Sequence, residues 1–185
     1  MKIDAPRYLL AICFDCGDTL VDEGSEVKDA RGVTLRADLI PGAADVVRAL
    51  KRQGYSLALV ADGPVETFTH ILTHYELTDC FGAFAISEEV GVEKPDARMF
   101  THALEQLGIQ RENYGRVVMI GNNLARDVKG ANALGIISVW LDWAPRRAKI
   151  PADASEVPQY TIETPLALLS LIEKLESPNN TRISG

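Results

Sequence analysis

Five short apolar runs, separated by segments with helical spacing, constrain the fold of this 185-residue chain more than any other feature. Runs of this length between turn-forming residues are typical of strands that are buried on both faces of a parallel sheet. Alternation of such strands with amphipathic helices predicts right-handed crossovers and an α/β fold, a three-layer α/β/α sandwich with a doubly wound, mostly parallel sheet. The runs occupy residues 9–14, 55–61, 83–87, 116–121 and 136–141.

The segments between the runs carry their own boundary signals. Pro95 opens a predicted helix and Gly108 closes it. Residues 22–39 are polar around a turn-like DARG and predict a small hairpin. The length suits one domain with a full core, which we expect over residues 1–176, followed by a disordered polar tail at 177–185.

Composition narrows the classes of partner. A net charge of −7 repels phosphate backbones and acidic lipids, which argues against nucleic acid and against a membrane as partners. Cys13, Cys16 and Cys80 are too few for a disulfide framework, and the N-terminus does not have the pattern of a signal peptide. We therefore expect a reduced, cytoplasmic setting. The apolar runs are too short to span a bilayer.

Polar and charged residues follow the apolar runs at the points where a parallel sheet collects its ligands. Asp15 ends the first run, and Asp18, Lys94, Asn122 and Asp127 lie in loops after this or later runs. The carboxyl ends of parallel strands meet in one crevice, so these side chains are expected to converge. Carboxylates and a carboxamide oxygen suit Mg²⁺, and an ammonium suits a phosphoryl group. The set predicts a magnesium and phosphate site.

Four segments carry a resemblance to a known family. FDCGDTL, ADG, EKPD and GNNLARDVKGANALGI occur in the order and approximate spacing of the four motifs of the haloacid dehalogenase-like (HAD) superfamily, most of whose members are phosphatases. The chain resembles this family over about Leu9 to Leu141. The resemblance implies that Asp15 is the nucleophile that forms an aspartyl-phosphate and that Lys94 steadies nucleophile and phosphoryl charge. It also implies a Mg²⁺ ion held by Asp15, the carbonyl of Gly17, Asn122 and Asp127.

The first motif departs from the family pattern. Gly17 stands where the family has a second Asp, and Asp18 stands where the family has Gly. In the family, that second Asp protonates the leaving group and then activates water. Asp18 could take over this role, or it could point away and only brace the turn. Loss of a positioned acid and base costs on the order of 10²–10⁴ in rate.

The second and fourth motifs depart as well. Ala61 replaces the Ser or Thr that would bind a phosphoryl oxygen, which leaves the backbone N–H groups of Asp62 and Gly63 as the expected anion-binding groups. Asn122 replaces the first Asp of the fourth motif, and its carboxamide ligates Mg²⁺ without charge. We therefore expect weaker binding of the metal than in the family, with part of the anion site retained.

The resemblance also defines what the chain lacks. Family members that act on small metabolites usually carry a cap domain after the first motif or between the second and third. Here residues 22–39 are hairpin-sized, and residues 65–93 hold only a helix and a short strand. We expect a site without a cap, open to a bulky or macromolecular phosphorylated substrate or covered by a partner subunit, for which a homo-oligomer is one arrangement.

These observations leave three functional hypotheses. The leading one is a cytoplasmic, Mg²⁺-dependent phosphohydrolase without a cap, acting on an unidentified phosphate ester or acyl phosphate and of reduced activity if the second acid is absent. The second is a catalytically silent HAD-fold binding module. Retention of Asp15, Lys94 and Asp127 argues against silence, whereas the three altered motif positions argue for it. The third is a dehalogenase, which would need the missing cap.

Two weaker patterns allow a functional and a structural interpretation. His70 and His74 have the spacing of a metal pair, but no third ligand is evident, so we expect an ordinary exposed helix face. At the end of the last apolar run and beyond it, Trp140, Trp143, Arg146 and Arg147 could form an aromatic and basic lip for an anionic substrate. We favour the simpler interpretation of a tryptophan packed against the last helix and solvated arginines.

Overall fold

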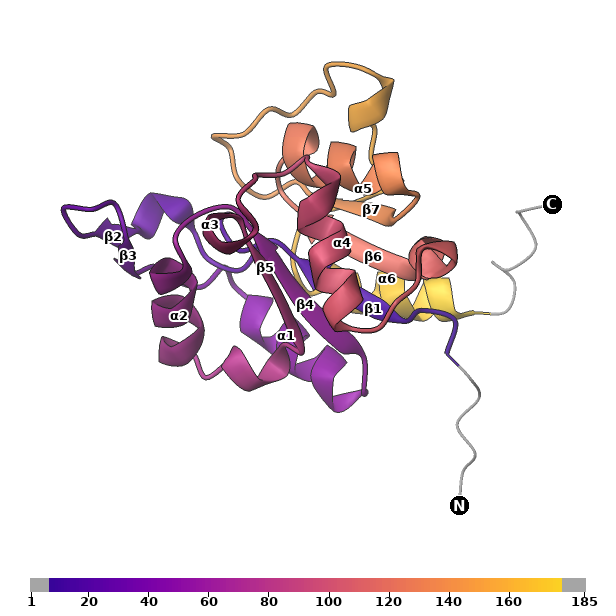
Figure 1. The fold of residues 1–185 in the computed structure, drawn as a ribbon, viewed down its shortest axis with the longest axis horizontal. Helices are drawn as coiled ribbons and strands as arrows, with labels where there is room; N and C mark the ends of the chain where they lie inside the picture. Colours follow the sequence, from indigo (N-terminus) through magenta and orange to yellow (C-terminus); the bar gives the residue numbers. More distant parts are fainter. Residues whose placement is uncertain (1–6, 178–185) are drawn as a thin grey trace.

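A six-stranded parallel sheet forms the centre of the molecule in the computed structural model, which describes residues 7–177 (Figure 1). All neighbouring strands are parallel, as predicted for the apolar runs. The strand order is β5-β4-β1-β6-β7-β8. The strands are β1 (Ala11–Phe14), β4 (Ser56–Ala61), β5 (Ala83–Ile86), β6 (Val117–Gly121), β7 (Ile137–Leu141) and β8 (Tyr160–Ile162).

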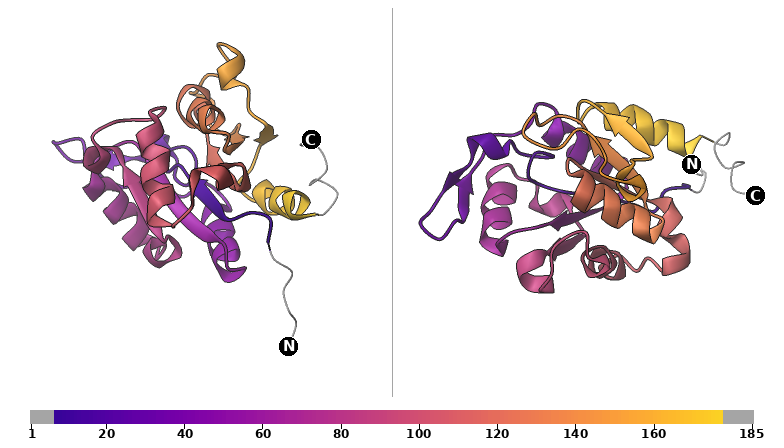
Figure 2. Two further views of the ribbon diagram at one scale, coloured as in Figure 1. Left: turned by 45° about the vertical axis from the view of Figure 1, so that its right-hand side comes forward. Right: turned by 90° about the horizontal axis from the view of Figure 1, so that it is seen from above.

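Helices cover both faces of this sheet, so the predicted three-layer sandwich is confirmed (Figure 2). On one face lie α1 (Ala43–Arg52), α2 (Val65–His74) and α6 (Ala167–Glu176). On the other face lie α4 (Ala97–Gln106) and α5 (Lys129–Leu134). Side chains alternate along each strand, so that Ile12 and Phe14 join the first core while Ala11 and Cys13 join the second.

The strand β1 has a special position because the chain winds away from it in both directions. It pairs with β4 on one side and with β6 on the other. The loops that follow β1, β4 and β6 therefore emerge next to one another at the carboxyl edge of the sheet. This point is where open α/β sheets bind ligands.

The predicted hairpin is present and packs beside α2. It consists of β2 (Val27–Lys28) and β3 (Thr34–Arg36), which pair antiparallel. Thr34 N donates to Thr67 Oγ1 on α2 at 2.9 Å, and His70 Nδ1 lies 3.0 Å from the Thr34 carbonyl. His74 is exposed as expected, whereas His70 is half-buried against the hairpin.

The insertions around the first two motifs are small. Between β1 and α1 the chain forms only the hairpin and a 3-10 turn (Glu23–Ser25), and between β4 and β5 only α2 and a 3-10 turn (Thr78–Cys80). Within residues 7–177 no further domain is inserted over the carboxyl edge of the sheet, in agreement with the predicted absence of a cap. None of the helices in this part of the chain is long and apolar enough to cross a membrane.

Two local details differ from the sequence prediction. The helix expected to open at Pro95 begins at Ala97, because Asp96 is its N-cap and accepts a hydrogen bond from Arg98 N at 2.9 Å. A short helix, α3 (Ser87–Val90), follows β5 and was not predicted. The predicted disordered tail beyond Ser177 lies outside the described residues.

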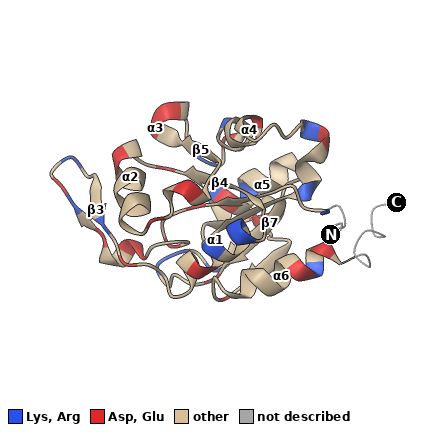
Figure 3. Cartoon of the chain, turned by 90° about the horizontal axis from the view of Figure 1, so that it is seen from below, with Lys and Arg blue, Asp and Glu red and all other residues tan. Residues whose placement is uncertain are grey.

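Acidic and basic residues are interspersed along the hairpin and helices (Figure 3).

Candidate active site

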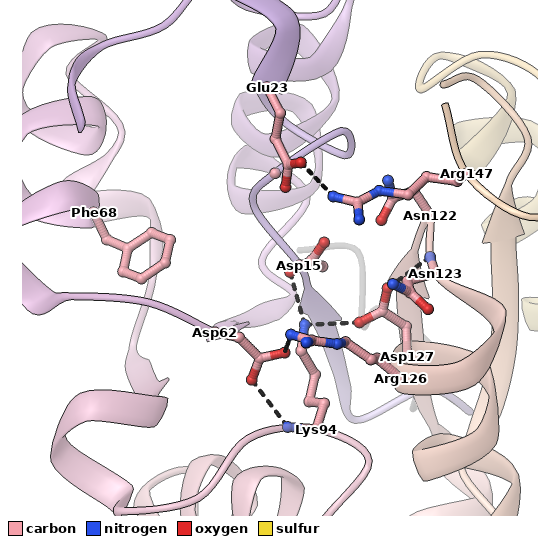
Figure 4. A pocket seen from close by; sticks show the side chains of 11 residues that line it. Asp15, Glu23, Asp62, Phe68, Lys94, Asn122, Asn123, Arg126, Asp127 and Arg147 are labelled. Carbon is pink, nitrogen blue, oxygen red and sulfur yellow. Dashed lines mark hydrogen bonds and ion pairs between the residues drawn. The ribbon is translucent and has the colours of Figure 1, made fainter. Parts of the chain in front are cut away.

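A cavity of about 60 Å³ lies at the carboxyl edge of β1, β4 and β6, and Figure 4 shows the side chains around it. Asp15 and Lys94 meet here although 79 positions separate them in the sequence, as predicted from the strand-end pattern. The cavity is lined by six of the residues predicted from the sequence: Asp15, Gly17, Asp62, Lys94, Asn122 and Asp127.

Lys94, Asp15 and Asp127 form a buried ion cluster, called here the inner cluster. Lys94 Nζ lies 2.7 Å from Asp15 Oδ1, 2.7 Å from Asp127 Oδ1 and 2.8 Å from the Val60 carbonyl oxygen. An ammonium has three donors, and all three are used. Lys94 therefore holds both carboxylates in place and supplies positive charge, rather than offering a hydrogen bond to a substrate.

Burial and charge oppose each other in the inner cluster. Burial alone would lower the pKa of Lys94, but the carboxylates of Asp127 and Asp15 outweigh it, and the net pKa of this ammonium is raised. Burial raises the pKa of Asp127, and the negative charge of Asp15 adds to this effect, while Lys94 counteracts both. The lysine thus pairs with both carboxyl groups and opposes the rise in the pKa of Asp127.

Asp127 reaches the cavity because the chain after β6 takes an unusual turn. Residues Leu124–Val128 form a π-helical turn before α5, with Asn123 as its N-cap. The Asn123 backbone N–H donates to Asp127 Oδ2 at 2.9 Å. A Cβ atom at Gly121 would overlap the Asp127 carboxyl group, so glycine at the end of β6 is required for this approach.

Asn122 is buried beside the inner cluster, and its side chain is incompletely satisfied. Only 2% of the residue is exposed, and Nδ2 has no hydrogen-bond partner. Its main-chain carbonyl accepts a hydrogen bond from Trp140 Nε1 at 2.9 Å, which links the loop to β7. Because buried polar groups are normally paired, this amide is available to a group bound in the cavity.

The second-motif residues are only partly turned toward this cavity. Asp62 lines it, accepts from Lys94 N at 2.9 Å and pairs with Arg126. Burial raises the pKa of the Asp62 carboxyl group, against the lowering effect of Lys94. The Gly63 N–H, predicted as an anion-binding group, donates to Ser87 Oγ at 2.9 Å. Ala61 is buried in the core and does not line this cavity.

Asp18 does not join the cavity lining. It is fully buried, with a φ of +51° that Asp tolerates, and one oxygen accepts from Glu23 N at 3.1 Å. Arg146 pairs with the same carboxylate, and Arg147 Nε lies 3.3 Å from it. Arg147 also pairs with Glu23. We call Asp18, Glu23, Arg146 and Arg147 the rim network.

Several residues around the cavity were not predicted as site residues, among them Glu23, Arg126 and Arg147. Arg126 lies within the fourth motif, so its position beside the cavity could have been predicted from the sequence. Arg147 follows β7 and lines the cavity, where it pairs with Asp18 and Glu23. Glu23 carries no such signal, because the irregular turn after β1 determines its position. Burial raises the pKa of the Glu23 carboxyl group, although Arg147 partly offsets this effect.

A second cavity of about 190 Å³ adjoins the first one. It lies between the hairpin and α2 and shares Gly17, Glu23, Asp62 and Phe68 with the first. Its further lining includes Glu26 and Lys28 of the hairpin region. The site therefore consists of a small polar cavity at Asp15 and a larger neighbouring one.

The donor atoms around the small cavity fit a hard divalent cation. Among residues 7–177 no three His, Cys, Asp or Glu side chains gather into a metal-binding group. Mg²⁺, however, is commonly bound by one or two carboxylates and completes its shell with water and substrate phosphate. Asp15 and Asp127 provide two carboxylates, and Asn122, which also lines the cavity, offers its carboxamide oxygen as a third donor; its unpaired Nδ2 suits an anion rather than the cation. This donor set fits Mg²⁺.

Comparison with known proteins identifies curated relatives. The glyceraldehyde 3-phosphate phosphatase of Methanopyrus kandleri is 30% identical over 138 residues, which cover 75% of this chain and 56% of that protein. The phosphoserine phosphatase of Thermus thermophilus is 33% identical over 127 residues, covering 69% and 48%. The chain thus spans about half the length of these relatives.

Solved structures and a family profile agree with this result. The putative HAD-hydrolase YfnB from Bacillus subtilis, whose crystal structure is bound to magnesium, has a TM-score of 0.71 at 19% identity, covering 90% of this chain and 99% of that one. Its likeness demonstrates the shared fold. The profile of haloacid dehalogenase-like hydrolases matches residues 25–135, which include Lys94, Asn122 and Asp127. The chain therefore belongs to the haloacid dehalogenase-like hydrolase family.

Proposed function

We propose that this chain is a Mg²⁺-dependent phosphatase that works through an aspartyl-phosphate on Asp15. The observation that carries the proposal is the inner cluster: a carboxylate at a strand end, bonded at 2.7 Å to a buried ammonium, faces a polar cavity. Curated relatives named as phosphatases support the same reaction class.

Each residue of the inner cluster has a role in this reaction. Asp15 attacks phosphorus, the ester oxygen leaves, and water then hydrolyses the aspartyl-phosphate. Lys94 orients Asp15 and balances the charge of the incoming phosphoryl group. Thr19 Oγ1 donates to Asp15 Oδ2 at 3.2 Å and orients the nucleophile from the opposite side.

Asp15, Asp127, the Asn122 carboxamide and the Gly17 carbonyl would hold Mg²⁺. When bound, the ion supplies positive charge that balances the phosphoryl oxygens. Asn122 brings no charge, so we propose weaker metal binding than a site with a third carboxylate would give.

The substrate class follows from the two adjoining cavities. The small polar cavity suits the phosphoryl group, and the larger one beside the hairpin suits the group that leaves. The absence of an inserted domain within residues 7–177 favours a bulky phosphorylated substrate over a small metabolite that must be enclosed.

Hydrolysis of p-nitrophenyl phosphate and acetyl phosphate with Mg²⁺ tests the proposal. We expect turnover by the unaltered protein and none above background by Asp15→Asn. Asp45→Asn, the same change on an exposed residue of α1, is the matched control and should leave the rate unchanged. Equal rates for the unaltered protein and Asp15→Asn would discard the enzymatic proposal.

Calorimetric titration distinguishes a catalytically silent binding module from an inactive preparation. A phosphatase site should bind Mg²⁺, and beryllofluoride should strengthen this binding as a mimic of the phosphoryl group on Asp15. A silent module binds neither.

A further inference from the structure

The reaction proposed above needs an acid and a base that the inner cluster does not provide. An alkoxide leaving group must gain a proton, and the attacking water must lose one. Asp15 is the nucleophile, and both oxygens of Asp127 are engaged, by Lys94 Nζ and Asn123 N. Both oxygens of Asp62 are engaged as well, by Lys94 N and Arg126.

Glu23 is the remaining acidic residue in the cavity lining, and one of its oxygens is available. Arg147 pairs with Oε2, and within the described residues no hydrogen bond is made to Oε1. The side chain is about one-third exposed, so that a substrate can reach it. Figure 4 shows Glu23 in the same pocket as Asp15, with its carboxylate on the side of Arg147.

The position of Oε1 is defined by its relation to Gly17. A Cβ atom at Gly17 would lie 2.9 Å from Glu23 Cδ and closer still to Oε1. A side chain at position 17 and the present conformation of Glu23 therefore exclude each other. The Glu23 carboxylate occupies the space into which a residue at position 17, two positions beyond the nucleophile, would project.

The turn after β1 positions the Glu23 carboxylate over Gly17. Asp18 N donates to the Val21 carbonyl at 2.7 Å, and the Asp18 carboxylate accepts from Glu23 N at 3.1 Å. Asp22 caps the 3-10 turn through Gly24 N at 2.8 Å. Asp18 is thus a positioning residue, buried beneath the turn.

We propose that Glu23 is the general acid and base of the phosphatase reaction, an inference that rests on the proposed function of this site. In the first step an Asp15 oxygen bonds to phosphorus, and the bond from phosphorus to the ester oxygen breaks. The electron pair stays on that oxygen, which takes the Glu23 proton and leaves as an alcohol. In the second step Glu23 takes a proton from water, whose oxygen attacks phosphorus. The bond to Asp15 breaks, which restores the Asp15 carboxylate and protonated Glu23 and releases inorganic phosphate.

Pre-steady-state kinetics of Glu23→Gln tests this assignment. p-Nitrophenolate leaves without a proton, so Asp15 should still be phosphorylated and release about one equivalent of product in a burst. Steady-state turnover should then fall on the order of 10²–10⁴ because water is no longer activated. Glycerol phosphate, whose leaving group needs a proton, should give a comparable loss and no burst. Mass spectrometry should detect the accumulated phosphoprotein.

Glu105→Gln is the matched control, because Glu105 is exposed on α4 and lines neither cavity. It should behave as the unaltered protein. Wild-type rates of Glu23→Gln on both substrates would overturn the assignment, and so would a uniform loss without a burst. The proposed function survives both results if Asp15→Asn is inactive. An inactive unaltered protein would instead overturn the function and this inference with it.

Transfer of the carboxylate from position 23 to position 17 gives an independent test. Glu23→Ala removes the carboxylate, and Gly17→Asp in that background returns one to the same space without the overlap. The double variant should turn over glycerol phosphate faster than Glu23→Ala alone. Equal rates of the two folded variants would contradict the assignment.

Discussion

Two ion clusters meet at the candidate site, and they are built in opposite ways. In the inner cluster the side chains of Lys94 and Asp127 are each 2% exposed. In the rim network the arginine side chains are 37% and 31% exposed, although they reach down to the fully buried Asp18. The first cluster joins strand ends, and the second joins the turn after β1 to the loop after β7.

The difference suits two tasks: the inner cluster keeps charged groups paired in the interior, whereas the rim network positions a side chain at the edge of the cavity. A buried ion pair is costly to break, because the remaining charge is left without a partner, whereas an exposed pair contributes little. The inner cluster therefore holds Asp15, the proposed nucleophile, through a buried ion pair. The rim network fixes Glu23 through the buried carboxylate of Asp18 and through Arg147, which solvent and salt can reach.

Lys94→Met should give the largest effect and tests the inner cluster directly. Removal of the ammonium leaves Asp15 and Asp127 buried together, which should lower the free energy of unfolding by about 3–5 kcal/mol. Urea denaturation followed by circular dichroism measures this change. A loss below that of a surface substitution would show that the two clusters do not differ in the way described.

The same variant should acquire a distinct pH dependence. Burial raises the pKa of Asp127 even beside Lys94, and loss of the ammonium should raise it further. The folded protein then retains a proton that the unfolded chain releases, so its stability should fall as pH rises above the ordinary range of Asp. The unfolding midpoint measured from acidic to neutral pH checks the sign.

Asp18→Asn should have an intermediate effect, because this residue is the buried end of the rim network. Its carboxylate accepts from Glu23 N, Arg146 and Arg147. Loss of hydrogen bonds to a charged group predicts a decrease of about 1.5–3 kcal/mol in the free energy of unfolding. In the burst assay Asp18→Asn should slow turnover less than Glu23→Gln. The reverse order would assign the acid and base role to Asp18.

Arg147→Ala should give the smallest change in stability, below about 1 kcal/mol, because the arginine is partly solvated. This difference in stability between Arg147→Ala and the unaltered protein should disappear at high salt, where exposed charges are screened. Denaturation of the variant and the unaltered protein at low and high salt measures this difference. A difference that persists at high salt would show that the ion pairs of the rim network behave like buried ones, as in the inner cluster.

The fold and the inner cluster could be predicted from sequence for one physical reason. Buried parallel strands leave continuous apolar runs, and their carboxyl ends converge whatever the loops do. Asp15 follows from that geometry because it directly follows β1, and Lys94 and Asp127 lie in the segments that continue from β5 and β6. The hairpin and the absence of an inserted domain followed from segment length.

The rim network could not be predicted because irregular backbone determines it. The positive φ of Asp18 turns its side chain under the loop, and the capped 3-10 turn sends Glu23 over Gly17. Neither conformation leaves a period or spacing in the sequence. The Gly63 N–H likewise meets Ser87, from the short helix α3 that no pattern indicated.

The indole bond between Trp140 and the Asn122 carbonyl gives the molecule an optical reporter of its own. The chain contains two tryptophans, and Trp143→Phe would leave Trp140 as the single tryptophan, which can be excited selectively over tyrosine. Its fluorescence depends on the hydrogen bond to a loop that borders the cavity. Ions or phosphate mimics that engage this loop should shift its emission, so that occupancy can be titrated without dyes or turnover.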